Sequence, residues 1–331
     1  MSDLEHQNIY YDMSKLLSFN KFLNISIGAR GLGKSYAAKR WAINNWLKNK
    51  KQFVYIRRYK TEFNNIKNYF SDIADRYPDH KFEVKKGCFY IDDEVAGYYI
   101  GLSTSQTQKS NSFPNVNIII FDEFIIDKGR ITYLKGEVQL FLDMIETIAR
   151  TRDDVRVLMI SNAISSINPY FLYFNVYPHD GDKFICRDQV IVEINKNTDF
   201  VNYKKATKFG QLIADTDYGK YSIENEFLRD DKSFVCKMSG KSICWYGLRY
   251  DDVEYSVWYN QPSGFVFITK KQTPDNIDIY AITTDDHKPN MILLSRSNEI
   301  FKRLKMAYDY GQVRFDCLQS KTAFLNIIQL I

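Results

Sequence analysis

SIGARGLGKSYAAKR, residues 26–40, joins a short apolar segment to a stretch whose apolar residues have helical spacing. Residues 28–35 have glycine, lysine and serine at every fixed position of the pattern G-x-x-x-x-G-K-[ST]. Glycines let successive backbone N–H groups face an anion, and the N-terminus of the following helix faces the same anion. Lys34 is then expected to reach the β- and γ-phosphates of ATP, and Ser35 to ligate Mg²⁺. The alternative is a glycine-rich turn that matches by chance. The predicted ATP-binding loop comprises Gly28, Ala29, Arg30, Gly31, Leu32, Gly33, Lys34, Ser35 and Tyr36.

A second motif, NIIIFDEF at residues 117–124, ends an apolar run with two acids. Asp122 is expected to hold Mg²⁺ through water, and Glu123 to polarise the attacking water, so that the reaction is hydrolysis. The alternative is an ordinary buried strand that ends in two carboxylates. Because the motif follows a phosphate loop in an alternating pattern, it favours a Walker B site, with Lys34 and Glu123 as candidate catalytic residues.

The first part of the chain alternates between strand-like and helix-like segments. Strands are expected at 22–28, 52–59, 116–124 and 155–162, helices at 35–49, 62–77 and 137–151, and a strand pair at 87–92 and 97–103. Such alternation predicts an α/β fold with a mainly parallel sheet. The acid pair, and an extra strand between the loop strand and the acid-bearing strand, indicate a P-loop NTPase of the additional-strand catalytic-glutamate (ASCE) type.

The pattern changes after residue 195. Short strands at 233–238, 242–248, 253–260 and 264–270 predict an antiparallel meander, followed by a helix at 299–310, a strand near 313–317 and a last helix at 320–330. The expected organisation is a P-loop ATPase domain at 1–197, a basic linker at 198–227 and a small α+β C-terminal domain at 228–331.

Charge and cysteine content limit the classes of protein. The net charge of +5 permits contact with nucleic acid without proving it. The five cysteines contain no C-x-x-C pair, which argues against a disulfide framework or zinc ribbon and for a reducing compartment. No apolar run is long enough to span a bilayer, and the N-terminus lacks the apolar core of a signal peptide. We expect a cytoplasmic protein with no membrane partner.

Several polar residues have more than one interpretation. Arg30, inside the loop, either touches the γ-phosphate, holds Glu123 of its own subunit, or is exposed. Asn162 follows an expected strand, where it either senses loss of the γ-phosphate or caps a turn. Arg150 and Arg152 end an expected helix, where an arginine either completes a neighbour's site or simply favours the helix C-terminus.

Two further segments have the polar chemistry of a protein surface. Arg57 and Arg58 follow an expected strand and are interpreted as solvated. The polar stretch 103–115, which includes Lys109, is either an ordinary surface loop or a segment facing a pore or a neighbour.

The segments NISIGARGLGKSYA, QFVYIRRYK, KSNSFPNVNIIIFDEF, SNAISSINPYF and TKFGQLI together resemble the DNA-packaging ATPase of phi29-like small tailed bacteriophages. The resemblance is strongest over residues 20–220. It implies a motor that drives double-stranded DNA into a procapsid, built as a pentameric ring at the portal (connector) vertex in the cytoplasm of the infected bacterium. In the best-known members a packaging RNA lies between portal and ATPase.

The resemblance also implies roles for individual residues. Arg150 matches a trans-acting arginine finger, and Lys109 matches a second residue acting in trans. Arg30 matches a loop arginine acting in cis, and Asn162 matches a coupling motif. With Lys34 and Glu123, Arg150 and Arg30 complete the expected catalytic set.

The C-terminal domain and linker have separate expectations. Larger terminases have an RNase H-like nuclease at this place, which needs converging carboxylates. The acids here lie at expected turns, and a vestigial nuclease-like domain that binds portal or RNA is the preferred interpretation; the acids are Asp251, Asp252, Glu254, Asp285 and Asp286. The basic residues of the linker region either contact DNA or RNA phosphates or are solvated; they are Lys196, Lys204, Lys205 and Lys208.

Three alternative functions remain open. One is a ring helicase or remodelling ATPase acting on other substrates. Another is a nucleotide-gated scaffold with negligible turnover, against which the acid pair argues. The third is a packaging ATPase that retains an active terminase nuclease.

Overall fold

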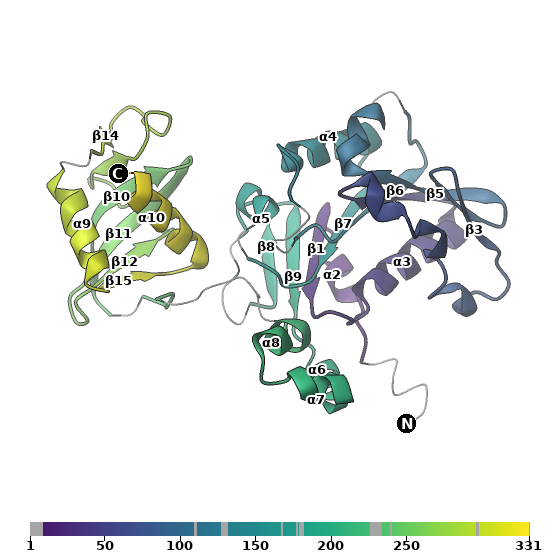
Figure 1. Ribbon diagram of the computed structural model, residues 1–331. Coiled ribbons are helices and arrows are strands. Elements are labelled where there is room, and N and C mark those ends of the chain that lie inside the picture. The colour runs from purple at the N-terminus through teal and green to yellow at the C-terminus, as the bar shows by residue number, and fades with distance from the viewer. Residues whose placement is uncertain are drawn as a thin grey trace. The chain divides into compact units, whose positions relative to one another are not determined.

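The computed structural model describes residues 9–108, 111–126, 132–166, 168–176, 178, 182–225, 234–238, 240–295 and 298–330. The chain divides into two units, Met1–Val176 with Asp180–Arg229 and Tyr177–His179 with Asp230–Ile331, called here the first and second units (Figure 1). Each unit has its own sheet and its own hydrophobic core. No helix within the described ranges is long and apolar enough to cross a membrane.

A nine-stranded sheet forms the centre of the first unit. From edge to edge its strands are β3 (Phe82–Lys85), β4 (Cys88–Ile91), β5 (Glu94–Gly101), β2 (Gln52–Arg57), β6 (Val116–Asp122), β7 (Arg156–Ser161), β1 (Leu23–Gly28), β9 (Val190–Asn195) and β8 (Phe184–Arg187). The six strands from β5 to β9 in this order are parallel, whereas β3, β4 and β8 pair antiparallel at the two edges. The expected α/β fold with a mainly parallel sheet is confirmed.

The strand order brings one end of β1, β2, β6 and β7 to the same edge of the sheet. β7 lies between β1 and β6, with Ile27 opposite Ser161 and Asp122 opposite Ile160. In open parallel sheets, ligands bind outside the carboxyl ends of the strands. The structure therefore places the loop after β1 and the acids after β6 at such an edge.

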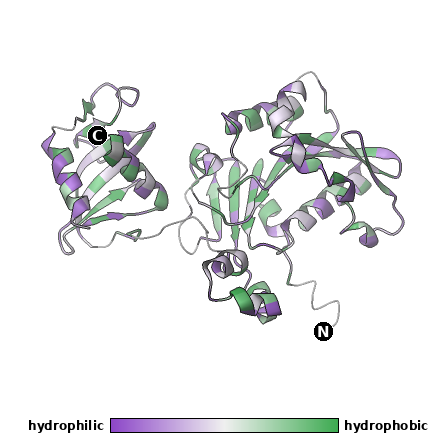
Figure 2. Ribbon diagram, in the orientation of Figure 1, coloured by the Kyte–Doolittle hydropathy of each residue, from purple (hydrophilic) through white to green (hydrophobic). Residues whose placement is uncertain are grey.

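Helices cover both faces of this sheet (Figure 1). α3 (Lys34–Asn49) packs its Ala38, Ile43 and Trp46 in one core cluster, and α4 (Glu137–Ala149) packs Phe141 and Ile145 in the other. The shorter helices are α2 (Ser14–Ser18) and α5 (Pro169–Tyr173). Because both faces are covered, the central strands β1, β6 and β7 are buried along almost their whole length, and Figure 2 shows most of their residues as hydrophobic.

The prediction of a helix at residues 62–77 is wrong. The segment forms 3-10 turns η1 (Lys60–Phe63), η2 (Ile66–Asn68) and η3 (Ala74–Arg76). Its asparagines and serine favour turns because their side chains compete for backbone groups, as Ser71 Oγ does by donating to the carbonyl of Asn68. The rings of Tyr69 and Phe70 pack against Phe89 at centroid distances of 4.3 and 5.5 Å. Packing of these rings under the sheet edge outweighs the helical spacing.

The segment expected to be a linker instead contains three helices of the first unit: α6 (Thr198–Ala206), α7 (Lys208–Ile213) and α8 (Asp217–Glu224). Asn197, Thr207 and Thr216 each cap one helix by accepting a backbone N–H bond. A Cβ added at Gly210 would lie 1.8 Å from the carbonyl oxygen of Lys204, so only glycine permits α7 to approach α6 this closely.

In the described residues, the second unit has a six-stranded sheet and two helices. Its strands in order are β14 (Ile292–Leu293), β13 (Ile279–Ala281), β10 (Ser242–Tyr250), β11 (Val253–Asn260), β12 (Phe265–Thr269) and β15 (Val313–Phe315). β10, β11 and β12 form the expected antiparallel meander. The helices α9 (Glu299–Asp309) and α10 (Leu318–Leu330) contribute Phe301, Phe324 and Ile327 to the core. In the strand expected at 233–238, the described part makes one isolated bridge, from Val235 to Phe315.

Of the five acids singled out in the second unit, Asp251, Asp252, Asp285 and Asp286 lie at turns as expected, whereas Glu254 lies in β11, where it accepts a hydrogen bond from the backbone N–H of Thr273. Asp251 and Asp252 form the β10–β11 turn with positive φ, and Asp286 accepts a hydrogen bond from Thr283 Oγ1. Across the described part of the chain, no three His, Cys, Asp or Glu side chains gather in a group that could hold a metal ion.

Candidate active site

The glycine-rich segment forms a loop between β1 and α3. Gly31 and Gly33 have φ values of +84° and +95°, which other residues adopt only under strain. Lys34 begins α3, and its ammonium is buried inside the loop. It donates to the carbonyls of Gly28 (2.7 Å) and Ala29 (2.9 Å) and to Asn162 Oδ1 (3.2 Å). The lysine ammonium is thus held by two backbone carbonyls of the loop and by the side chain of Asn162.

Burial lowers the pKa of Lys34 to about 8, an effect that the carboxylate of Asp122 partly offsets and the ammonium of Lys204 increases. The loop therefore carries a cation whose charge is not fully compensated by the protein. A polyanion bound at the loop would stabilise the charged form.

Asp122, the last residue of β6, lies beside the start of α3. Its Oδ2 accepts hydrogen bonds from Ser35 Oγ (3.0 Å) and from the hydroxyl of Tyr55 (3.0 Å). Burial raises the pKa of Tyr55 well above its ordinary value, so the hydroxyl remains a donor. A serine hydroxyl and a carboxylate at this distance fit Mg²⁺, which prefers hard oxygen ligands.

Glu123 projects from a strained turn after β6. Its φ is +56°, and its backbone N–H donates to the carbonyl of Ile160 (2.8 Å). Its carboxylate is 57% exposed and is held by Arg57 Nη2 at 2.5 Å. Arg57 also binds Glu62 at 2.9 Å. In this structure Arg57 therefore occupies the position beside Glu123 that the sequence left open for Arg30.

The interpretation of Arg57 and Arg58 as solvated is wrong. Their side chains are 17% and 1% exposed, and Arg58 forms an ion pair with Glu137 at 2.8 Å. Arg57 is the last residue of β2, and Arg58 follows it. The parallel neighbour of β2 is β6, which carries Asp122 and Glu123 at its end. Arg57 is drawn inward by the carboxylate of Glu123, and Arg58 by that of Glu137 in α4. This strand neighbour cannot be read from positions along the sequence.

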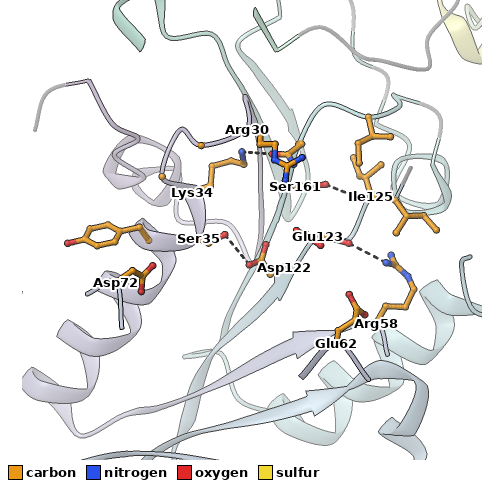
Figure 3. Close-up of a pocket in the computed structure, with 16 residues that line it drawn as sticks. Arg30, Lys34, Ser35, Arg58, Glu62, Asp72, Asp122, Glu123, Ile125 and Ser161 are labelled. Atoms are coloured by element: carbon orange, nitrogen blue, oxygen red, sulfur yellow. Dashed lines mark hydrogen bonds between the residues drawn. The ribbon is translucent and has the colours of Figure 1, made fainter. Parts of the chain in front are cut away.

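A cavity of about 710 Å³ lies at this edge of the sheet. Figure 3 shows Lys34, Ser35, Asp122 and Glu123 converging on it. The expected site residues that line it are Arg30, Gly31, Gly33, Lys34, Ser35, Tyr36, Asp122, Glu123 and Asn162. Ala29 and Leu32 are buried beneath the loop, and Gly28 contributes its carbonyl to Lys34.

Of the expected trans-acting residues, Lys109 lies outside the described residues, and Arg150 is exposed at the end of α4, with φ +50°. Arg150 does not line the cavity of its own chain. Arg152 has a structural role, because its guanidinium donates to the carbonyls of Phe113, Pro114, Val116 and Ile148. No such acceptor for the Arg150 side chain occurs among the residues that the structure describes. Of the two arginines, Arg150 is therefore the one available to a neighbour.

The four basic residues expected to contact nucleic acid differ in their surroundings. Lys204 Nζ donates to the carbonyls of Arg30 (2.5 Å) and Ser222 (2.6 Å), and Lys205 pairs with Glu224. Lys196 and Lys208 are exposed. Lys204 thus joins α6 to the phosphate loop.

Sequence reasoning missed Tyr55 and Arg57, which contact the two acids directly. The sequence signal for these contacts was the presence of polar side chains, Tyr55 and Arg57, within and at the end of an apolar strand. That signal becomes informative only when the strand is known to lie beside β6.

Three comparisons agree on one family. The model for podovirus DNA encapsidation protein (Gp16) matches residues 5–329. The DNA packaging protein of Bacillus phage phi29 is 40% identical over 312 residues, 94% of each chain. A chain of the bacteriophage phi29 viral genome packaging motor assembly has a TM-score of 0.74 at 38% identity, covering 97% of this chain and 99% of that one. The N-terminal domain of the phi29 DNA packaging ATPase is 46% identical with a TM-score of 0.55, covering 58% of this chain and 98% of that one.

Proposed function

The chain belongs to the podovirus DNA encapsidation protein family, and from this premise we propose that it is an ATP-driven motor that moves double-stranded viral DNA through the portal into a procapsid. The observation that carries the proposal is the convergence of Lys34, Ser35, Asp122 and Glu123 on one cavity. The similarity to the phi29 DNA packaging protein extends over nearly the whole chain, and the N-terminal domain of the phi29 DNA packaging ATPase matches 58% of it, which supports this use of the site.

The site is proposed to bind ATP with Mg²⁺. Backbone N–H groups of the loop and the Lys34 ammonium bind the phosphates, while Ser35 and Asp122 hold the metal. When bound, Mg²⁺ neutralises charge on the phosphate oxygens. The position of β7 between β1 and β6, with a glutamate after the aspartate, supports assignment to the ASCE class.

Glu123 is proposed as the general base. Its carboxylate accepts a proton from the water that attacks the γ-phosphate. Because Arg57 binds this carboxylate, Glu123 must first separate from Arg57. Asn162, which contacts Lys34 at 3.2 Å, is placed to respond when the γ-phosphate is lost.

The site is proposed to be completed by a neighbouring subunit in a pentameric ring, with Arg150 as the finger, Lys109 as its trans-acting companion and Arg30 acting in cis. The exposure of Arg150 supports this assignment. The ring acts on the procapsid portal in the cytoplasm of the infected bacterium. The second unit is proposed as a vestigial RNase H-like domain that binds the portal or a packaging RNA, and Lys196 and Lys208 as contacts to phosphates.

Double-stranded DNA is expected to raise ATP turnover by the full chain on procapsids, because hydrolysis is coupled to movement along the duplex. Turnover is measured with double-stranded DNA, with single-stranded DNA and without DNA. Stimulation by single strands alone would instead indicate a helicase, and Mg²⁺- or Mn²⁺-dependent cutting of the DNA would indicate a retained nuclease.

The salt dependence of DNA binding tests separately whether the chain contacts the phosphates of the duplex. A packaging motor must ignore base sequence, so its contacts are with phosphates, and affinity should fall by orders of magnitude between about 50 and 200 mM salt. A flat dependence would contradict the phosphate contacts.

ATP affinity is expected to fall as pH rises above about 8, the pKa of Lys34 in the free site. The bound triphosphate favours the charged lysine and raises its pKa, so binding above this pH takes up one proton. The affinity then decreases by up to about tenfold per pH unit. Calorimetry with a non-hydrolysable ATP analogue at pH 7 and 9, in buffers of different ionisation enthalpy, measures that proton. Equal affinity and no proton uptake at pH 9 would contradict the assignment.

A further inference from the structure

A buried group of three side chains, Arg58, Glu137 and Tyr170, lies directly behind the catalytic edge. Arg58 and Glu137 are each 1% exposed. Arg58 Nε lies 2.8 and 3.0 Å from the two carboxylate oxygens of Glu137, and Arg58 Nη2 lies 2.9 Å from Oε1. The hydroxyl of Tyr170 donates to the same Oε1 at 2.7 Å. We call these three residues the buried cluster.

The remaining donors of Arg58 contact the chain that follows β6. Nη2 donates to the carbonyl of Phe124 at 2.6 Å, and Nη1 donates to the carbonyl of Glu123 at 3.3 Å, the contact drawn in Figure 3. A guanidinium offers this planar fork of donors, whereas an ammonium does not. Arg58 thus fixes both the partner carboxylate and the main chain of Glu123.

Stability alone does not account for the buried cluster. Removing two charges from water is costly, and replacing a buried ion pair with apolar residues is often neutral or stabilising. Glu123, the residue whose carbonyl Arg58 binds, has a φ of +56°, a conformation that persists only when surrounding contacts hold it.

The buried cluster joins the segments that carry the proposed chemistry. Arg58 follows Arg57, which binds the Glu123 carboxylate. Glu137 is the first residue of α4, whose last turn leads to Arg150. Tyr170 lies in α5, in the segment that follows Asn162. All three segments therefore meet at one guanidinium–carboxylate pair.

We propose that Arg58, Glu137 and Tyr170 are positioning residues that hold the main chain of Glu123 in its strained conformation, so that its carboxylate is aimed at the attacking water, and that fix the start of α4 to it. This inference rests on the proposed function. Arg58 also lines the cavity, but its hydrogen bonds go to Glu137 and to the carbonyls of Glu123 and Phe124, so its proposed action is through Glu123.

The main test is the Arg58→Met/Glu137→Met double substitution, assayed in the full chain on procapsids with double-stranded DNA. The apolar pair should fold, with a lowered unfolding midpoint because the Tyr170 hydroxyl and the backbone N–H of Leu134 lose their acceptor. The ATP affinity should be unchanged, while turnover falls about 10–100-fold because Glu123 is misplaced. In a Glu123→Gln background, single-turnover measurements should show little additional loss, because the buried cluster acts through Glu123. A purely structural role would lower turnover equally in both backgrounds.

Tyr170→Phe provides a milder variant that keeps the test decisive if the double variant does not fold. It removes one buried hydrogen bond to a glutamate. Tyr11→Phe is the matched control, because Tyr11 also donates to a buried glutamate, Glu193, at 2.7 Å. Turnover should fall in Tyr170→Phe and not in Tyr11→Phe.

Two results would overturn the inference. Equal turnover in Tyr170→Phe and Tyr11→Phe would exclude a positioning role. Full turnover in a folded Arg58→Met/Glu137→Met variant would also exclude it, provided that Glu123→Gln is inactive. If Glu123→Gln itself retained wild-type turnover, the proposed function would fail, and this inference with it.

Discussion

Replacing Glu123 with glutamine is expected to lower ATP turnover about 10²- to 10⁴-fold, the range that general base catalysis contributes. The amide keeps the shape and much of the hydrogen bonding of the carboxylate, and it does not accept a proton from water. The ATP affinity should be preserved, because Lys34, Ser35 and Asp122 are intact. Steady-state hydrolysis with double-stranded DNA and equilibrium nucleotide binding measure the two effects separately.

The control for this substitution is Asp93→Asn, which also removes one carboxylate from the first unit. Asp93 lies in the β4–β5 turn, where it pairs with Lys81, and asparagine tolerates its φ of +64°. ATP turnover by the Asp93→Asn variant should match that of the wild type. Turnover that survives in Glu123→Gln would mean that another group activates the water.

The parts of the site predicted from sequence are those encoded within one continuous segment. The loop from Gly28 to Ser35 has its ligands next to one another, and Asp122 and Glu123 are adjacent. The identity of each motif follows from its own residues, because their chemistry requires those side chains at that spacing. The alternation of apolar strands and helices then brings the two motifs to one edge of the sheet.

The parts that were missed depend on which strands are neighbours. Tyr55 and Arg57 reach the two acids because β2 pairs with β6, and Arg58 is buried because Glu137, far along the chain, supplies its counter-charge. From the sequence alone, paired arginines after a strand are typical of a surface. The register of a parallel sheet is a tertiary property, and local propensity does not contain it.

The same distinction explains the errors in secondary structure. Residues 62–77 have helical spacing, yet aromatic packing around Phe89 favours 3-10 turns. Residues 198–224 have polar composition typical of a linker, yet capping residues Asn197, Thr207 and Thr216 begin three helices. In the second case the signal was present in the sequence, because an N-cap residue marks each helix start.

Replacing Arg150 with alanine is expected to lower turnover by about 10³- to 10⁵-fold, the contribution of an arginine finger to phosphoryl transfer. We propose that it acts on another subunit, because Arg150 is exposed at the end of α4 and is absent from the lining of its own cavity. Arg152→Ala is the matched control, because Arg152 donates to four carbonyls of its own chain and should affect stability rather than a neighbour's site.

Mixed rings test directly whether Arg150 acts in trans. Arg150→Ala subunits keep an intact nucleotide site, and Lys34→Ala subunits keep the arginine. Each variant alone should be inactive on procapsids with double-stranded DNA. Mixing them should restore part of the turnover, because a Lys34→Ala subunit supplies Arg150 to the intact site of its Arg150→Ala neighbour. A mixture as inactive as its components would contradict action in trans, since an arginine that serves only its own site cannot be supplied by a neighbour.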